Sequence, residues 1–301
     1  MEKCVSVIVP SYNRAHLLKK TIPSYIQENV GEVIIVDDAS TDNTFDVINE
    51  LKEIYPEIIY VRMVKNSKQT AAKNEGIRNA KFPYIYFGDD DSFITESTIS
   101  KLLNTLIEKK ADVVGAKALY MDNDEEEKNI NEFIAQKSKR FINITEVKKF
   151  LDIRNLFFIT FDWDYIESLK VPFCHACALV KREILNDIKF DTSYGGNAFR
   201  EETDLFTRIS AAGYTIYYNS SAVQINLPRK QVIKNKSLIK YKLKSSYYEF
   251  FNTLKYLKKN YAFLKSYYLI NESYLFIWLI YLKDALKIKT QKFITMLFYK
   301  N

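Results

Sequence analysis

The chain has 301 residues, 47% of them hydrophobic, which suffices for a large buried core and excludes disorder over most of its length. Its formal net charge of +7 is unevenly divided. Residues 226–301 carry 16 Lys and Arg against three acids, or +13, which leaves −6 for residues 1–225. The sequence therefore describes an acidic body with a basic tail.

Strands and helices are predicted to alternate through the first 120 residues. Short, apolar, β-branched runs predict strands at Val5–Pro10, Glu32–Asp37, Ile58–Met63, Tyr84–Phe87 and Asp112–Ala118. Helical apolar spacing falls between them, at Ala15–Asn29, after the polar turn Asp38–Asn43, at Thr70–Ala80 and at Thr98–Lys109. This alternation is typical of an α/β fold with a mainly parallel, doubly wound sheet flanked by helices.

The pattern changes after residue 120. Residues 121–170 open with the acidic run Asp122–Glu127 and continue with mixed helical and aromatic segments, which we interpret as an insertion near the acceptor side of a cleft. Regular structure resumes with a strand-like stretch at Cys174–Val180, a helix at Glu201–Ala212 and a strand at Tyr214–Tyr218. We expect one domain over residues 1–225 and a helical tail over 226–301.

The tail is aromatic as well as basic, since it contains ten of the 22 tyrosines. Such a mixture suits an anionic membrane surface or nucleic acid, and it also suits helices that pack on the body or on a second subunit. Its longest uncharged stretch, Ser273–Leu282, is far shorter than the ~20 residues that cross a bilayer. The tail is therefore not expected to span a membrane.

The cysteines give a weak signal. We expect no secretory leader, because the chain opens directly into an apolar strand-like run, and the three cysteines then fit a reducing cytosol. Cys174 and Cys177 have the spacing of a zinc or redox pair, but no second pair accompanies them. We interpret them as two small buried residues of a strand.

Three polar clusters follow predicted strands, at Ser11–Arg14, Asp37–Asp42 and Asp89–Asp91. Ligands of parallel sheets bind beyond the carboxyl ends of the strands, so we expect these clusters to meet in one cleft. Alternate side chains of a strand point to the same face, so Asp89 and Asp91 can lie on one face of the strand end. Their like charges there favour a bound cation. Hard oxygen ligands suit Mg²⁺ or Mn²⁺ with a phosphorylated cargo, although an acidic turn that only caps the next helix would look similar.

The segments Val5–Arg14 (VSVIVPSYNR) and Val36–Thr44 (VDDASTDNT) resemble the two opening signatures of the family 2 glycosyltransferases of GT-A fold. Gly88–Asp91 (GDDD) stands where that family has its DxD motif, and the resemblance spans roughly residues 3–225. It implies transfer of a sugar from a nucleotide donor. It also implies that Asp91 binds the metal and that Asp89 binds the metal or the donor's ribose.

The resemblance further implies which residues bind the donor. Tyr12 is expected to stack on the base, and Asp38 is expected to accept the imide proton of uracil. Lys73 lies in Ala71–Gly76 (AAKNEG), where the family has arginine, and is expected to face the diphosphate. The complete expected set is Pro10, Ser11, Tyr12, Arg14, Asp38, Lys73, Asp89 and Asp90.

Arg200–Leu205 (REETDL) resembles the acidic signature that supplies the family's general base. Glu202 is the first choice for this base, and Glu201 and Asp204 are the other candidate catalytic carboxylates. The base would take a proton from an acceptor hydroxyl as that oxygen attacks the anomeric carbon, which would invert its configuration. Alternatively, Glu201 and Glu202 only form the charged start of a helix, where acidic side chains interact favourably with the helix dipole. Asn226 falls about where many relatives have a histidine, which weakens any metal or phosphate contact expected there.

The leading hypothesis is a metal-dependent, inverting glycosyltransferase that uses Mg²⁺ or Mn²⁺ and a nucleotide-sugar donor, with UDP-sugars favoured. The acceptor would be a glycan, a polysaccharide or a lipid-linked molecule, and no nucleic-acid partner is expected. We expect a cytoplasmic protein whose tail lies on the cytosolic face of the membrane. The alternative is an inactive relative that serves as a membrane scaffold or binds nucleic acid. A sugar nucleotidyltransferase is disfavoured, because SYNRAHLL lacks a glycine-rich phosphate loop.

Overall fold

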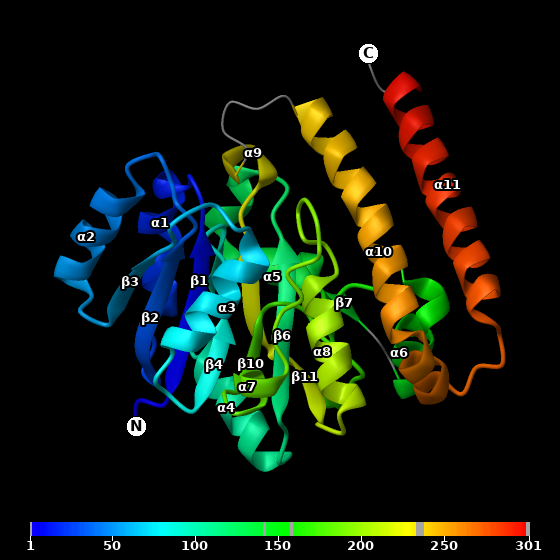
Figure 1. Ribbon diagram of the computed structural model, residues 1–301, viewed down its shortest axis with the longest axis horizontal. Coiled ribbons are helices and arrows are strands. Elements are labelled where there is room, and N and C mark those ends of the chain that lie inside the picture. The colour runs from blue at the N-terminus through cyan, green and yellow to red at the C-terminus, as the bar shows by residue number, and fades with distance from the viewer. Residues whose placement is uncertain (1, 141–142, 157–158, 233–237, 299–301) are drawn as a thin grey trace.

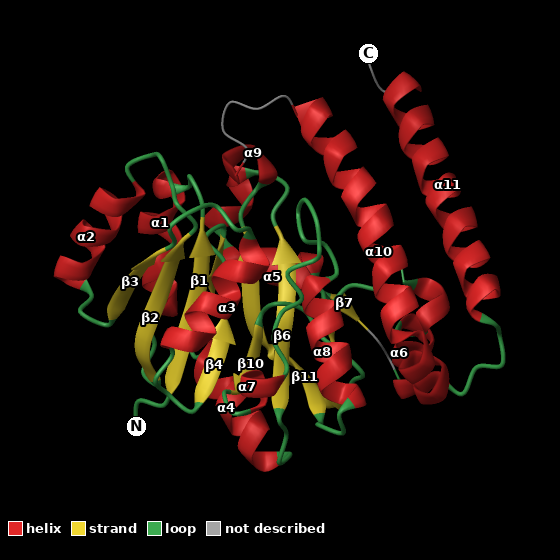
Figure 2. Cartoon of the chain, viewed as in Figure 1, coloured by secondary structure: helices red, strands yellow, loops and turns green. Residues whose placement is uncertain are grey.

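The computed structural model describes residues 2–140, 143–156, 159–232 and 238–298. In this part of the chain, nine strands form a mixed central sheet with helices on both faces (Figures 1 and 2). The strand order is β3-β2-β1-β4-β10-β6-β11-β5, and β9 pairs with β11. The strands of this sheet are β1 (Val5–Ser11), β2 (Val30–Asp37), β3 (Ile58–Arg62), β4 (Tyr84–Phe87), β5 (Ser92–Ile94), β6 (Val113–Tyr120), β9 (Leu169–Lys170), β10 (Ala178–Lys181) and β11 (Ile216–Asn226).

The other elements connect and cover these strands. The helices are α1 (Ala15–Thr21), α2 (Thr44–Ile54), α3 (Gln69–Asn79), α4 (Thr98–Glu108), α5 (Ile130–Lys137), α6 (Ile144–Phe150), α7 (Ile184–Asp187), α8 (Glu201–Ala211), α9 (Arg229–Val232), α10 (Leu238–Tyr268) and α11 (Tyr274–Phe298). Short 3₁₀ turns are η1 (Ile22–Tyr25), η2 (Asp124–Lys128) and η3 (Ile153–Asn155), and β7 (Lys139–Arg140) pairs with β8 (Trp163–Asp164) in a second small sheet.

β1 shows why the expected strands read as continuous apolar runs. Ile8 belongs to a core cluster shared with α3 and α8, whereas Val7 and Val9 belong to a second cluster shared with α1 and α4. Successive side chains of a strand point to opposite faces, and both faces of this sheet are covered by helices. The mainly parallel α/β architecture expected from the sequence is confirmed.

The structure differs from the expected elements at three places. β11 was expected at 214–218, but it starts at Ile216 and continues to Asn226. The helix expected over 15–29 ends at Thr21 and continues only as η1, because Pro23 at the start of that turn lacks a backbone donor. β10 is shorter than the expected strand over 174–180 and runs antiparallel between β4 and β6, with Leu179 opposite both Tyr86 and Val114. This strand separates two parallel strands that the alternation suggested would be neighbours.

The tail packs on the body. α10 lies along α8, and α11 folds back along α10, so that the two form an antiparallel hairpin at one side of the molecule (Figure 1). Tyr256 of α10 is fully buried, and its hydroxyl lies 3.0 Å from that of Thr207 on α8. None of the helices in the described residues combines the length and hydropathy that crossing a bilayer requires.

Candidate active site

The loops after β1 and β2 are joined by hydrogen bonds at the carboxyl edge of the sheet. Ser11 at the end of β1 pairs with Asp37 at the end of β2. Asn13 follows with a φ of 54°, its N–H donates to Ser40 Oγ at 2.9 Å, and its side-chain oxygen accepts from Thr41 N at 2.7 Å. Asparagine tolerates this left-handed backbone better than most residues. Two of the predicted polar clusters therefore meet.

The third cluster, at the end of β4, is fixed by Tyr25. Asp89 N donates to the Tyr25 hydroxyl at 3.1 Å, and this hydroxyl lies 3.0 Å from the carbonyl oxygen of Asp89 and 3.1 Å from that of Ser92. A Cβ on Gly88 would lie 2.8 Å from Tyr25 Cζ, so the close approach requires glycine. Tyr25 and Asn13 were not among the predicted site residues, because their contacts join segments that are far apart along the chain.

Arg14 joins the first cluster to the third. Its Nη1 donates to Asp90 Oδ1 at 2.6 Å and to Asp91 Oδ2 at 2.7 Å. The sequence predicted that the like charges of these aspartates favour a bound cation. The guanidinium supplies one positive charge, so it offsets one of the three negative charges while it bonds two of the carboxylates.

Asp89 has a different environment from its two neighbours. Burial raises its pKa to about 7, an effect that Lys73 opposes and that the charges of Asp91 and Glu202 reinforce. The structure gives its carboxylate no hydrogen bond among the described residues, so its oxygens remain available as hard ligands. This donor chemistry fits Mg²⁺ or Mn²⁺.

A metal held here would need ligands from outside the protein. The described residues contain no group of three or more His, Cys, Asp or Glu placed to hold a metal ion. Mg²⁺ commonly keeps waters and takes phosphate oxygens alongside one or two carboxylates. The residues present therefore fit an ion that arrives with a diphosphate better than a closed protein cage.

Lys73 of α3 connects the acidic signature to the strand-end clusters, because it contacts Glu201 and Glu202 and its charge acts on Asp89. Glu201 and Glu202 form the first turn of α8, and Lys73 Nζ lies 3.0 Å from Glu201 Oε1 and 2.5 Å from Glu202 Oε1. Burial raises the pKa of Glu201 to about 8, although Lys73 opposes this shift. Lys73, which the resemblance directed at the diphosphate, thus contacts the candidate general base.

Asp204, the third candidate carboxylate, contacts α10 and its own helix. It is fully buried, and it accepts from Arg208 Nε at 2.8 Å, Lys259 Nζ at 2.9 Å and Asn260 Nδ2 at 2.9 Å. These contacts anchor the tail, and the structure does not bring Asp204 to the lysine that joins the two glutamates.

The remaining predicted donor residues line the same edge of the sheet. Pro10 and Ser11 are buried at the end of β1, and Tyr12 is 43% exposed beside them. Asp38 is buried and accepts from Ser67 N at 2.6 Å and Lys68 N at 2.9 Å. Each of its oxygens keeps a further lone pair for a ligand.

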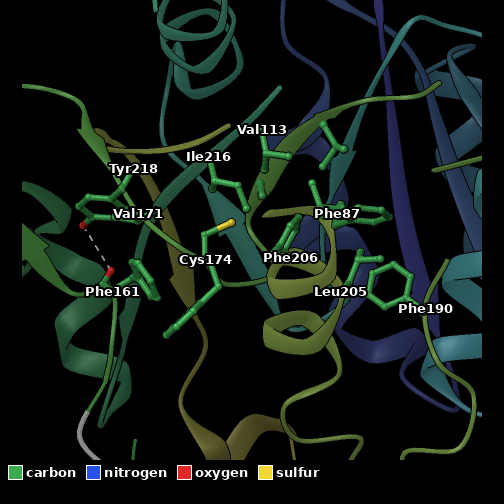
Figure 3. Packing of buried hydrophobic residues seen from close by; sticks show 14 of the residues in the cluster. Phe87, Val113, Phe161, Val171, Cys174, Phe190, Leu205, Phe206, Ile216 and Tyr218 are labelled. Atoms are coloured by element: carbon green, nitrogen blue, oxygen red, sulfur yellow. Dashed lines mark hydrogen bonds between the residues drawn. The ribbon is translucent and has the colours of Figure 1, made fainter. Parts of the chain in front are cut away.

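Cys174 and Cys177 are buried thiols, as the sequence analysis interpreted them, and Cys174 lies within the main hydrophobic cluster (Figure 3). Burial raises the pKa of both thiols and lowers that of His175 to about 4. Neutral thiols in an apolar core are poor metal ligands and poor nucleophiles. Both cysteines precede β10, which begins at Ala178, so they are buried as expected but do not lie in a strand.

A large groove of about 1130 Å³ lies apart from these acids. It is bounded by the start of α4, by α5, by residues 164–166 and by the bulge of β11 at 220–223. Its described lining includes none of the predicted site residues. This groove is therefore separate from the predicted donor-binding and catalytic residues.

Comparison with known proteins gives the family. The model of glycosyl transferase family 2 matches residues 6–189, more than half of the chain. The chain is 26% identical over 223 residues to the glycosyltransferase GlyG of Streptococcus pneumoniae, covering 73% of this chain and 70% of that protein. It is 30% identical over 114 residues to a poly(ribitol-phosphate) beta-glucosyltransferase of Bacillus spizizenii, covering 36% of this chain but only 18% of that relative.

Solved structures confirm the fold. A mannosyltransferase from Pyrobaculum calidifontis, in complex with GDP-Man and Mn²⁺, aligns over 99% of this chain and 82% of its own, with a TM-score of 0.59 and 16% identity. Staphylococcus aureus TarS in complex with UDP-GlcNAc aligns over 88% of this chain and 74% of its own, with a TM-score of 0.55 and 16% identity. The chain has a GT-A fold and belongs to glycosyl transferase family 2.

Proposed function

We propose that the protein is an inverting glycosyltransferase that moves a sugar from a UDP-sugar to a hydroxyl of a glycan, polysaccharide or lipid-linked acceptor. One observation carries the proposal beyond family membership. Lys73 bonds Glu202, and its charge also acts on Asp89, so the candidate base and the strand-end acids face the same space. A transferase needs this proximity, because the acceptor hydroxyl and the leaving diphosphate flank one carbon.

The proposed step is a single displacement. Glu202, whose side chain is 22% exposed, takes the proton of the acceptor hydroxyl. The acceptor oxygen forms a bond to the anomeric carbon as the bond from that carbon to the phosphate oxygen breaks, and the electron pair leaves with the nucleotide diphosphate. Attack from the opposite face inverts the configuration at that carbon.

The donor would lie along the carboxyl edge of the sheet. In this proposal Tyr12 stacks on the base, and Asp38 accepts its imide proton next to Pro10 and Ser11. Asp89 and Asp91 would hold a divalent ion, which when bound neutralises charge on the leaving diphosphate. Arg14 orients the aspartate loop, with Asp90 as its buried partner.

We further propose that the enzyme works at the cytosolic face of a membrane. The outer face of α11 exposes Leu275, Phe276, Leu279 and Leu286, and Lys283 and Lys287 are exposed beside them. A helix with an apolar face and adjacent lysines suits the surface of an anionic bilayer. Residues 226–301 would then hold the catalytic body close to a lipid-linked or surface-polymer acceptor.

A donor panel tests the catalytic proposal. Turnover of nucleotide sugars is measured with Mg²⁺, with Mn²⁺ and after chelation, in the wild type and in Asp91→Asn and Glu202→Gln. We expect wild-type turnover with a uridine donor and a loss of at least about 100-fold in Glu202→Gln, since general base catalysis contributes roughly 10²–10⁴-fold. We expect a large loss in Asp91→Asn as well, because it removes a proposed ligand of the ion that would neutralise the leaving diphosphate. Equal turnover in all three proteins contradicts the site assignment, and an inactive wild type on every donor contradicts the function.

A further inference from the structure

The ammonium of Lys73 contacts both glutamates of the acidic signature, Glu201 and Glu202. The lysine is fully buried on α3, with Nζ 3.0 Å from Glu201 Oε1, 2.5 Å from Glu202 Oε1 and 5.1 Å from the centre of the Phe190 ring. Its charge is therefore satisfied by two carboxylates and an aromatic face. Burial of a lysine is unfavourable unless such partners are in place.

The two glutamates that share this lysine differ in access. Glu201 is 2% exposed, and its Oε2 has no hydrogen-bond partner among the described residues. Glu202 is the one with a side chain that solvent reaches, at 22%. This asymmetry makes Glu201 a buried partner of Lys73 and leaves Glu202 able to meet an acceptor.

We propose that Lys73 is the positioning residue of the general base, an inference that rests on the proposed function. Its hydrogen bond holds Glu202 by one oxygen and directs the other to the acceptor hydroxyl. Lys73 on this account does not bind the diphosphate.

The resemblance to the family suggested the opposite assignment, and the two make different kinetic predictions. A residue that binds the diphosphate contributes to the affinity for the nucleotide. A residue that positions the base contributes to kcat and little to the affinity for the nucleotide. Lys73→Met keeps the aliphatic stem but removes the charge, and Lys73→Arg restores the charge with a different shape.

A matched control comes from Lys259 of α10. Its Nζ also lies 2.9 Å from a buried carboxylate of α8, that of Asp204, but this pair anchors the tail and does not contact Glu202. Lys259→Met is expected to lower stability and to leave kcat and its pH profile close to those of the wild type.

The experiment measures kcat, KM for the best donor of the panel, the pH profile of kcat, and the dissociation constant of UDP. We expect Lys73→Met to lower kcat by about 100-fold or more and to change UDP binding by less than about threefold. Lys73→Arg should recover at least about tenfold of the lost kcat.

Other outcomes overturn the inference. A UDP affinity that falls tenfold in Lys73→Met with kcat retained would place the lysine at the diphosphate. An unchanged kcat and pH profile in folded Lys73→Met would make the lysine structural only, without affecting the proposed function. An inactive wild type on every donor contradicts the function and this inference together.

A second variant serves if Lys73→Met does not fold. The double substitution Lys73→Met with Glu201→Gln replaces the buried cation and its buried carboxyl partner together by neutral groups, and such paired replacements are tolerated far better than the loss of one partner. It should show the same loss of kcat with UDP binding again retained. Wild-type values in this double variant also overturn the inference.

Discussion

Gly76 determines how closely α3 approaches the first strand, and with it the position of Lys73 on the same helix. A Cβ at residue 76 would lie 2.3 Å from Cγ2 of Ile8, a branched side chain buried between sheet and helix. Branched side chains have few alternative rotamers, so the helix would have to move. We expect Gly76→Ala to lower the free energy of unfolding by about 1–2 kcal/mol, since overpacking exceeds the gain in helix propensity.

Chemical denaturation checks this expectation, with Asn79→Ala as the control on the same helix. Asn79 is exposed and bonds only to Glu75 one turn earlier, so its replacement should change stability by less than about 0.5 kcal/mol. A Gly76→Ala protein as stable as the wild type would show that the contact with Ile8 relaxes without cost.

Glu201 makes stability depend on pH. Burial raises its pKa from 4.5 to about 8 in the folded protein, so the folded state binds more protons than the unfolded state between these values. The stabilisation is present below pH 4.5 and is lost as the pH rises towards 8. We expect the wild type to lose stability from pH 5 to pH 8, at up to about 1.4 kcal/mol per pH unit per proton.

Replacement of the titrating group tests this assignment. Denaturation of Glu201→Gln at pH 5, 6.5 and 8 should show a smaller loss of stability over the interval. Asp89→Asn should flatten the curve mainly below pH 7, because the pKa of Asp89 is raised only to about 7. Curves that run parallel to the wild type in both variants would contradict these two assignments.

The sequence could predict the clusters of acidic residues, but it could not predict which basic side chains pair with them. The carboxylates at 89–91 and 201–202 are visible as clusters in the sequence. Their cations, Arg14 and Lys73, come from positions 76 and 128 residues away along the chain, and only the folded chain brings them into contact. Tyr25 was missed for the same reason, because its hydroxyl reaches Asp89 across 64 residues.

At the scale of elements, the loop before α8 is held by α10. Tyr248 lies on Gly196, whose φ is +66° and where an added Cβ would lie 2.0 Å from the ring. Asn252 Nδ2 donates to the Gly195 carbonyl at 3.0 Å, and Lys255 Nζ donates to the Ser193 carbonyl at 2.7 Å. The tail thus restrains the segment that leads to the candidate base.

Asp204 tests whether the third acid of the signature is structural. Asp204→Asn keeps the shape of the side chain but removes the carboxylate that pairs with Arg208 and leaves Lys259 with Asp191 alone. We expect a loss of about 1–3 kcal/mol in the free energy of unfolding, as for hydrogen bonds to charged groups. We also expect kcat of the folded fraction to stay within about threefold of the wild type. A loss comparable to that of Glu202→Gln would instead make Asp204 catalytic.

Regular elements were predictable where local pattern and tertiary position agree. Strands β1 to β4 and helices α3, α4 and α8 lie within about two residues of their expected bounds, because a buried strand or an amphipathic helix needs little further information. β10 was not placed, since its four residues do not indicate direction or neighbours. β5, with three residues, is too short to give any periodic signal.

At the scale of the whole molecule, the division of charge along the chain coincides with a structural division between the sheet and the helical hairpin. The sequence predicted this basic tail, yet it could not show that α10 covers α8 while α11 exposes leucines. Contacts between elements far apart in sequence decide which face of an amphipathic helix is covered.

Binding to vesicles tests the membrane proposal. Replacement of Leu275, Phe276 and Leu279 by serine should weaken binding to anionic vesicles by tenfold or more, because each buried apolar side chain contributes about 1.5–3 kcal/mol. Ile166→Ser is the matched control, since Ile166 is fully exposed but lies outside the tail. Lys283→Gln with Lys287→Gln should remove about 1 kcal/mol each and reduce the salt dependence. Binding to oligonucleotides alone would exclude the membrane as the partner of the tail.

The insertion of β10 between β4 and β6 has a consequence for biosynthesis. Residues 178–181 are translated after both of their sheet neighbours, so a nascent chain that ends before them leaves two facing strand edges open. The sheet therefore cannot close between β4 and β6 while the ribosome is still extending the first 177 residues. Chaperone binding should peak at that length and fall once β10 has emerged.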